Sequence, residues 1–181
     1  MGSFPSPLIH SDRLELREYN RDDLGPASEV AAAGEGEALP PGFPTNPEQL
    51  AQWFDDGMHL GGRDNALHLM MLDRASGRIV GSIGLFHPDW QVGSTEIGYG
   101  VRRDARNQGY ATEALVAVTA WVLTEGGIQR AWLTANTDNL ASIRVAVKAG
   151  FHREGTLRRA GLEDDGLHDL ALFSLLNDEL T

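Results

Sequence analysis

The residues around position 106 have the types and spacing of a site that binds a phosphate-like anion. Arg102, Arg103 and Arg106 lie between the end of a predicted strand and the start of a predicted helix near Gly109. The first turn of a helix has unpaired N–H groups and carries the positive end of the helix dipole. Gly109 and Ala111 have little or no side chain, so an anion can approach the backbone closely. The segment predicted to form this anion site contains Arg103, Arg106, Asn107, Gln108, Gly109, Tyr110, Ala111 and Thr112.

The composition excludes several other kinds of chemistry. The 181 residues include no cysteine, which excludes disulfides, thiolate nucleophiles and Cys-based zinc sites. Ala149 follows the single lysine, Lys148, so no Walker-type Gly-Lys-Ser/Thr loop exists. The six histidines show no metal-ligand spacing, and we predict no metal site. A net charge of −11 repels nucleic acid and suits a cationic substrate, although solubility explains it equally well.

The hydrophobic pattern outlines the strands and helices that must position these residues. Apolar side chains at Ala111, Leu115, Val118 and Val122 recur on one face, and they predict a long helix over residues 109–125. Other helices are expected over residues 22–33, 46–54 and 139–150. Strands are expected over residues 8–18, 66–72, 79–86, 95–101, 131–134, 151–157 and 167–175. The order predicts one mixed α/β domain over residues 1–181.

Four short motifs stand in a fixed order along the chain. They are Ser11-x-Arg13-Leu14-x-Leu16-Arg17, Glu96-Ile97-Gly98-Tyr99, Arg106-x-x-Gly109-x-Ala111, and Asn139-x-x-Ser142 followed by Gly150-Phe151 and Glu154-Gly155. The third motif matches the pyrophosphate-binding motif of the GNAT acyl-CoA N-acyltransferases, and the chain as a whole resembles that family. The other three motifs are similar to its ribosomal-protein N-terminal acetyltransferase (RimJ/RimL-like) branch. The resemblance covers nearly the whole chain.

The resemblance implies a fold and a cofactor. The GNAT fold is a mixed, mostly antiparallel twisted sheet of about seven strands, splayed in the middle and flanked by about four helices. The cofactor is acetyl-CoA, whose pyrophosphate is expected on the predicted anion site. Its pantetheine is expected along the strand that contains Gly98, Tyr99 and Val101, and beside Asn139. The amine then attacks the thioester directly, in agreement with the absence of cysteine.

The attacking amine must lose a proton. A lysine-like amine of pKa ~10.4 costs ~4–5 kcal/mol to deprotonate at pH 7, whereas an α-amine of pKa ~8 costs only ~1.4 kcal/mol. Glu96 lies on the strand that lines the thioester and is the first candidate for a general base. The resemblance adds Glu154, and also Glu163 in an expected loop over residues 161–165. Related ribosomal acetyltransferases have a carboxylate near position 161, where this chain has Gly161.

The leaving thiolate needs a proton or a hydrogen bond. Many members of the family have a tyrosine seven residues after the position of Asn139, where this chain has Ala146. The resemblance to the ribosomal branch implies that Ser142 takes this place. A capping role in the first turn of the helix explains Ser142 as well.

The resemblance implies transfer of an acetyl group from acetyl-CoA to a primary amine, first of all the α-amine of a protein N-terminus. A small cationic amine, such as an antibiotic or a polyamine, is the alternative acceptor. A catalytically silent sensor that binds acyl-CoA is a third hypothesis. We expect a cytoplasmic protein that binds neither nucleic acid nor membrane. The acceptor, the acyl group and a homodimeric state stay open at this point.

Overall fold

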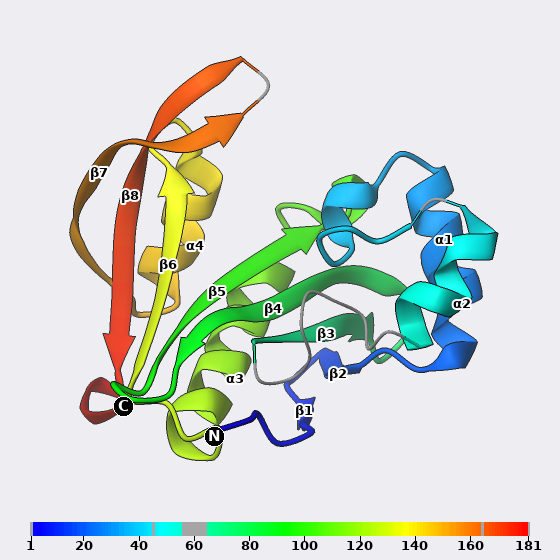
Figure 1. Cartoon of the computed structure of the whole chain (residues 1–181), viewed down its shortest axis with the longest axis horizontal. Helices are drawn as coiled ribbons and strands as arrows, with labels where there is room; N and C mark the ends of the chain where they lie inside the picture. The colour runs from blue at the N-terminus through cyan, green and yellow to red at the C-terminus, as the bar shows by residue number, and fades with distance from the viewer. Residues whose placement is uncertain (1, 45, 56–64, 164, 181) are drawn as a thin grey trace.

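The strands of the protein form one twisted sheet with two curved halves (Figure 1). The computed structural model describes residues 2–44, 46–55, 65–163 and 165–180. The strand order is β1-β2-β3-β4-β5-β6-β8-β7, and every neighbouring pair is antiparallel except β5 and β6. The predicted mixed, mostly antiparallel sheet is therefore confirmed, with eight strands instead of about seven. The strands are β1 (Leu8–His10), β2 (Leu14–Glu18), β3 (Ala66–Asp73), β4 (Ile79–Asp89), β5 (Ser94–Val101), β6 (Arg130–Asn136), β7 (His152–Glu163) and β8 (Gly166–Leu176).

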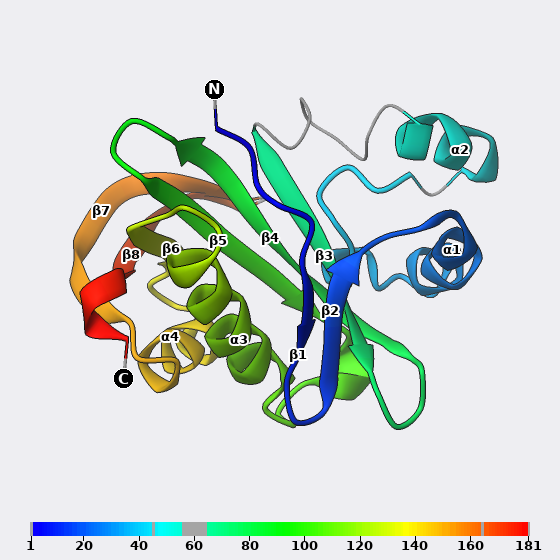
Figure 2. The same cartoon turned by 90° about the horizontal axis from the view of Figure 1, so that it is seen from below.

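Helices cover both faces of the sheet (Figure 2). On one face lie α3 (Tyr110–Thr124) and α4 (Leu140–Lys148), and on the other lies α1 (Leu24–Ala32) with the short 3₁₀ turn η2 (Gly36–Ala38). The fourth α-helix of the described ranges is α2 (Pro47–Asp55), so the expected number of about four is met. Within those ranges, no helix is long and apolar enough to span a membrane.

The main core lies between the sheet and α3. Leu115, Val118 and Val122 of α3 are fully buried, as their spacing predicts. Buried and half-buried residues alternate along β6, because one face of that strand packs on the helices. Nearly all of β3 is buried, because helices cover this strand on both faces. The packing of α3 against the sheet fixes where its first turn, with the predicted anion site, must lie.

The sheet opens in the middle, between its only parallel pair of described strands. Ser94–Glu96 of β5 pair with Arg130–Trp132 of β6, and the last register pair joins Glu96 to Trp132. Beyond this pair the two strands diverge (Figure 1). The rest of β5 continues to pair with β4 on its other side, up to Val101 opposite Gly81. The splay that the resemblance implied is therefore present, and Glu96 lies at its apex.

The strand expected over residues 8–18 is wrong as a single element. The chain reverses at residues 11–13, and β1 and β2 form an antiparallel hairpin. The turn is held from outside, because the backbone N and the Nε of Arg13 donate to the Glu113 carboxylate at 2.7 and 2.8 Å. The Ser11 hydroxyl donates to the same carboxylate at 2.7 Å. These contacts tie the hairpin to the first turns of α3.

The closing hairpin is longer than the pattern indicated. The loop expected over residues 161–165 is wrong, because β7 continues to Glu163 and β8 begins at Gly166. Gly161 pairs with His168, so the position where relatives have a carboxylate belongs to a strand. The strand expected over residues 79–86 is likewise longer, since β4 runs on to Asp89.

Candidate active site

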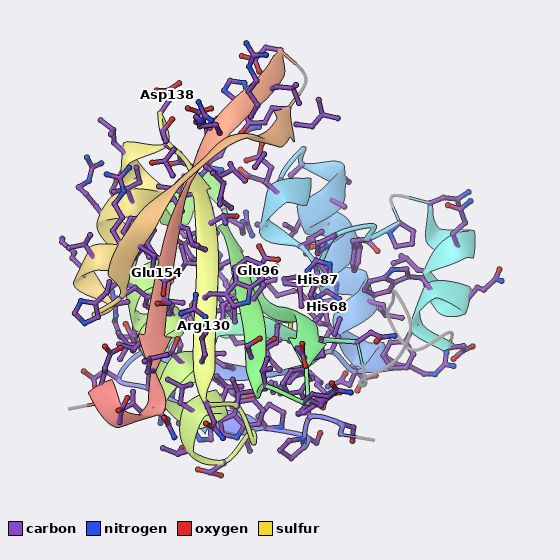
Figure 3. The ribbon with its side chains drawn as sticks, turned by 60° about the vertical axis from the view of Figure 1, so that its left-hand side comes forward. His68, His87, Glu96, Arg130, Asp138 and Glu154 are labelled. Atoms are coloured by element: carbon purple, nitrogen blue, oxygen red, sulfur yellow. The ribbon has the colours of Figure 1, made fainter. Side chains whose placement is uncertain are left out.

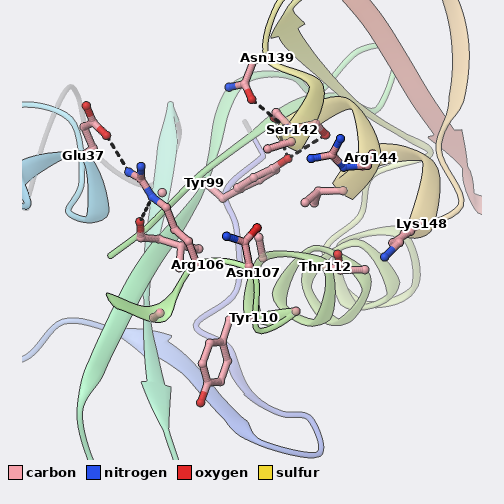
Figure 4. Close-up of a pocket in the computed structure, with 17 residues that line it drawn as sticks. Glu37, Tyr99, Arg106, Asn107, Tyr110, Thr112, Asn139, Ser142, Arg144 and Lys148 are labelled. Atoms are coloured by element: carbon pink, nitrogen blue, oxygen red, sulfur yellow. Dashed lines mark hydrogen bonds and ion pairs between the residues drawn. The ribbon is translucent and has the colours of Figure 1, made fainter. Parts of the chain in front are cut away.

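A pocket of about 620 Å³ opens between the start of α3, the helix α4 and the free end of β5 (Figure 4). It lies on the face of the sheet that α3 and α4 cover. The structure brings ten of the predicted site residues together in its lining. They are Tyr99, Val101, Arg106, Asn107, Gly109, Tyr110, Ala111, Thr112, Asn139 and Ser142.

The start of α3 has the backbone conformation of an anion site. Gly109 precedes the helix with φ of 87°, a left-handed conformation that glycine adopts without strain. Gly109, the N-cap residue, has no side chain that could accept from the N–H groups of the first turn, so these groups lack the usual capping partner. Asn107, two residues earlier, is also left-handed with φ of 61°. These amides and the helix dipole favour a phosphate group in the pocket.

Cationic side chains stand on two walls of the pocket. On the α3 side, the Nε of Arg106 donates to the Val101 carbonyl at 3.1 Å, and its Nη2 lies 2.9 Å from an oxygen of Glu37. On the other side, Arg144 and Lys148 line the pocket from α4 (Figure 4). Arg144, Lys148 and Glu37 were not among the residues predicted to form the site. The four-residue spacing of the first two on a predicted helix was an available signal, whereas Glu37 comes from the distant turn η2.

Three residues predicted to bind the cofactor do not line the pocket. Gly98 lies on the opposite face of β5, where an added Cβ would be 3.1 Å from the Phe86 ring. Gln108 turns its amide to the Asp104 carbonyl at 2.9 Å. The backbone N of Arg103 donates to the carboxylate of Glu35, which is distant in the sequence. The pocket is therefore lined by most of the residues predicted to bind the cofactor, but not by these three.

Two hydroxyl groups meet inside the pocket. The Tyr99 hydroxyl lies 2.8 Å from the Ser142 Oγ, and the Asn139 Oδ1 accepts a hydrogen bond from the Ser142 backbone N at 3.0 Å. Asn139 thus caps α4 and fixes Ser142 in its first turn. Burial raises the pKa of Tyr99, although the hydrogen bond with Ser142 opposes the shift. Both hydroxyls therefore keep their protons near neutral pH, while Ala146 is fully buried in the core.

Two of the candidate bases, Glu96 and Glu154, lie on the other face of the sheet (Figure 3). Glu96 shares this face with Trp132, since the two are register partners in a parallel pair. Its Oε2 lies 3.0 Å from the His87 Nδ1, and its side chain is 23% exposed. Glu96 is therefore placed at the apex of the splay, across the sheet from the pocket.

Glu154 is held in an ion pair. The two terminal nitrogens of Arg130 donate to its carboxylate at 2.5 and 2.7 Å, and the Ser174 hydroxyl donates at 2.6 Å. The hydrogen bonds from Arg130, and then that from Ser174, lower the pKa of Glu154 to about 2. A carboxylate with this pKa is a poor proton acceptor near neutral pH. The Glu154 carboxylate is therefore occupied by Arg130 of β6, and this ion pair favours a structural role over that of a general base.

Glu163 lies at the far end of the same face. It accepts a hydrogen bond from the Asn136 Nδ2 at 2.9 Å. Together with Asp165 and His168 it forms a group whose ligand-type atoms lie within 4.8 Å of one another. The His168 Nε2 is 2.7 Å from Asp165, and this hydrogen bond raises the pKa of His168. The spacing of the histidines did not predict this cluster. The absence of a metal stays a prediction, and His59 lies outside the described residues.

Comparison with known proteins identifies this arrangement. Residues 13–152 match the Acetyltransferase (GNAT) domain family. The chain belongs to the GNAT acetyltransferase family. It is therefore an acyl-CoA-dependent N-acetyltransferase, as the motifs implied, and the fold described above is the GNAT fold.

Individual proteins of known sequence or structure are similar to this chain over different lengths. The chain is 28% identical to the uncharacterized N-acetyltransferase YoaA of Bacillus subtilis, over 94% of this chain and 97% of YoaA. It is 31% identical to the ribosomal-protein-serine acetyltransferase of Escherichia coli over 47% of this chain and 48% of that protein. Among solved structures it is similar to RimL, a ribosomal L7/L12 alpha-N-protein acetyltransferase in complex with coenzyme A. The TM-score is 0.81 at 21% identity, with 96% of this chain and 99% of RimL covered.

Proposed function

We propose that this GNAT protein transfers the acetyl group of acetyl-CoA to the α-amine of a protein N-terminus, with residues 1–181 acting as one domain. The observation that carries the proposal is the splay between β5 and β6. It separates a pocket with free helix amides on one face from a carboxylate, Glu96, on the other face. An activated acyl group and an amine can therefore reach the apex from opposite sides.

The pocket fits the charged half of coenzyme A. The uncapped first turn of α3 and the guanidinium of Arg106 suit a pyrophosphate. The unpaired edge of β5 near Tyr99 and Val101 offers backbone groups to amides of a pantetheine chain. When bound, acetyl-CoA supplies an activated acyl group and a thiolate leaving group. We assign Ser142 to donate a hydrogen bond to the departing sulfur. The Tyr99 hydroxyl, 2.8 Å from the Ser142 Oγ, orients the Ser142 hydroxyl.

Glu96 is the residue assigned to receive the proton of the amine. Its carboxylate is partly exposed on the face opposite the pocket, at the last paired position before the strands diverge. Glu154 is a weaker candidate because Arg130 and Ser174 occupy its oxygens. Glu163 lies at the other end of β6, bonded to Asn136. A single modest base suits an α-amine, whose deprotonation costs only ~1.4 kcal/mol at pH 7.

A small cationic amine is the second candidate acceptor. The observation that favours it is the acidic end of the β7–β8 hairpin, where Glu163 and Asp165 lie close together on an exposed surface. The net charge of −11 attracts cations in general. A polyamine or an amine-bearing antibiotic would profit from both features.

A screen of acceptors tests the proposal. The protein is incubated with acetyl-CoA and, separately, with peptides that have free N-termini and with polyamines, and the products are read by intact mass. We expect acetylation of an N-terminal amine in at least one peptide. Acetylation of polyamines alone would move the function to the second candidate. Calorimetric binding of acetyl-CoA with no thiol release from any acceptor would indicate the silent sensor.

The base assignment needs its own variant. Glu96→Gln keeps the size of the side chain and removes the proton acceptor. We expect turnover near neutral pH to fall about tenfold with an α-amine acceptor and ~10²-fold or more with a lysine-like amine, and to recover as the pH approaches the pKa of the acceptor amine. A pH–rate profile identical to that of the wild type would remove Glu96 from the mechanism.

A further inference from the structure

A strained residue stands beside the apex of the splay. The register between β4 and β5 shifts between Phe86 and Asp89, which marks a bulge in β4. Within it, His87 has φ of 47°, a left-handed conformation that costs a non-glycine residue free energy. Bulges re-aim side chains, and strained residues cluster at functional sites. The question is therefore what the imidazole of His87 contacts.

The imidazole contacts the candidate base. The His87 Nδ1 lies 3.0 Å from the Glu96 Oε2. An ionised carboxylate only accepts hydrogen bonds, so Nδ1 carries the hydrogen and donates it. Among the described residues, the side chain that contacts the Glu96 carboxylate is that of His87. The contact occupies one carboxylate oxygen and leaves Oε1 for another donor.

The surroundings confine Glu96 to the apex. On the same face, the Phe86 ring lies across Gly98 on β5 and packs edge-on against His68 of β3, with ring centroids 5.2 Å apart. Charged groups on this face also include Arg130 of β6, which pairs with Ser94 two residues before Glu96, and its partner Glu154 of β7, with Glu163 at the far end. Figure 3 shows His87 and Glu96 with these groups around them.

We propose that His87 is a positioning residue, which holds the Glu96 carboxylate at the apex of the splay so that its free oxygen faces the incoming amine. The inference rests on the proposed role of Glu96. The proton passes from the acceptor ammonium to Oε1 of Glu96, and the neutral amine then attacks. His87 itself exchanges no proton with the acceptor in this scheme, and its hydrogen bond fixes the orientation of the base.

The strain allows a test that separates this role from a structural one. His87→Gly removes the imidazole and relieves the left-handed backbone, so the variant should melt at the same temperature as the wild type or higher. We expect its kcat to fall about fivefold, the upper end for an exposed ion-paired hydrogen bond, because the His87 side chain is 79% exposed to solvent. The KM for acetyl-CoA should not change, because the pocket lies on the other face. The deficit should shrink as the pH rises past the pKa of the acceptor amine.

Two further variants complete the design. His87→Asn places an amide N–H where Nδ1 was and tolerates a positive φ, so it should restore kcat to within about twofold. Arg159→Gly is the matched control, because exposed Arg159 is also left-handed with φ of 52° and its backbone contact survives the change. It should relieve strain in the same way and leave kcat unchanged.

The outcomes keep the two proposals apart. If His87→Gly has full kcat in an assay where Glu96→Gln is slow, the role of His87 is overturned and that of Glu96 stands. If His87→Asn is as slow as His87→Gly, the hydrogen-bonding role is overturned. If Glu96→Gln is fully active, the base assignment in the proposed function fails first.

Discussion

Replacement of Glu154 by glutamine separates its structural role from a catalytic one. Glu154→Gln keeps the shape of the side chain and can keep one hydrogen bond with Ser174, but it removes the charge that pairs with Arg130. The pKa of Glu154 is lowered from its ordinary value near 4.5 to about 2, first of all by hydrogen bonds from Arg130. Taken at face value, a shift of this size corresponds to roughly 3 kcal/mol.

The exposed position of the pair reduces this figure. The side chains of Arg130 and Glu154 are 32% and 38% exposed, so solvent screens their attraction. We therefore expect the variant to lose about 1 kcal/mol of unfolding free energy at pH 7. A lowered carboxyl pKa stabilises the fold above pH 4.5, and this contribution is lost as the pH falls from there towards 2. Wild type and variant should therefore converge in stability over that interval.

Urea unfolding at a series of pH values measures the difference. Arg130→Gln is the matched partner, and the double variant closes a cycle whose coupling free energy should be about 1 kcal/mol. Turnover of Glu154→Gln should stay within a few-fold of the wild type. A fall in kcat of a hundredfold or more in a folded variant would refute the reasoning, because Glu154 would then be the group that accepts the proton.

Three more predictions follow from the pocket and its walls. Ala111→Asp adds a negative charge at the start of α3, so acetyl-CoA should bind at least tenfold more weakly by calorimetry while the melting temperature holds or rises. Ser142→Ala should lower kcat more than it raises the KM for acetyl-CoA in steady-state kinetics, because its hydrogen bond strengthens as the thiolate forms. Gly100→Ala should destabilise the fold by about 1–3 kcal/mol in urea unfolding, because its methyl would overlap the Glu37 carbonyl, whereas Gly155→Ala meets nothing within 4 Å and should cost little.

Local patterns in the sequence predicted the parts of the fold that local forces decide. The spacing of Leu115, Val118 and Val122 predicted α3 to within about one residue at each end, and Gly109 marked its start. The β1–β2 hairpin was missed, although its turn has local hydrogen bonds between Ser11 and Leu14, because the alternation of apolar residues runs on through the turn. The contact of Arg13 with Glu113, which ties the turn to α3, joins residues 100 positions apart. A contact of that separation leaves no trace in the hydrophobic period.

The candidate site divides in the same way. The place of the expected anion site was predictable, because a glycine followed by a helix start marks it in the sequence. The face on which Glu96 lies was not, since strand alternation gives two faces and only the packing of α3 decides between them. The ion pair of Glu154 with Arg130 joins β7 to β6 across β8, and sequence gives no register for such a contact.

The divergence of β5 and β6 places two strand edges inside the molecule. Edges normally run along the outer rim of a sheet, where their unpaired amide and carbonyl groups invite pairing with a second chain and aggregation. Here Tyr99 and Val101 on the edge of β5 line the pocket beside α3 and α4 instead of an outer rim. The fold can therefore keep backbone hydrogen-bonding groups available to a narrow flexible ligand without adding an exposed edge to the sheet.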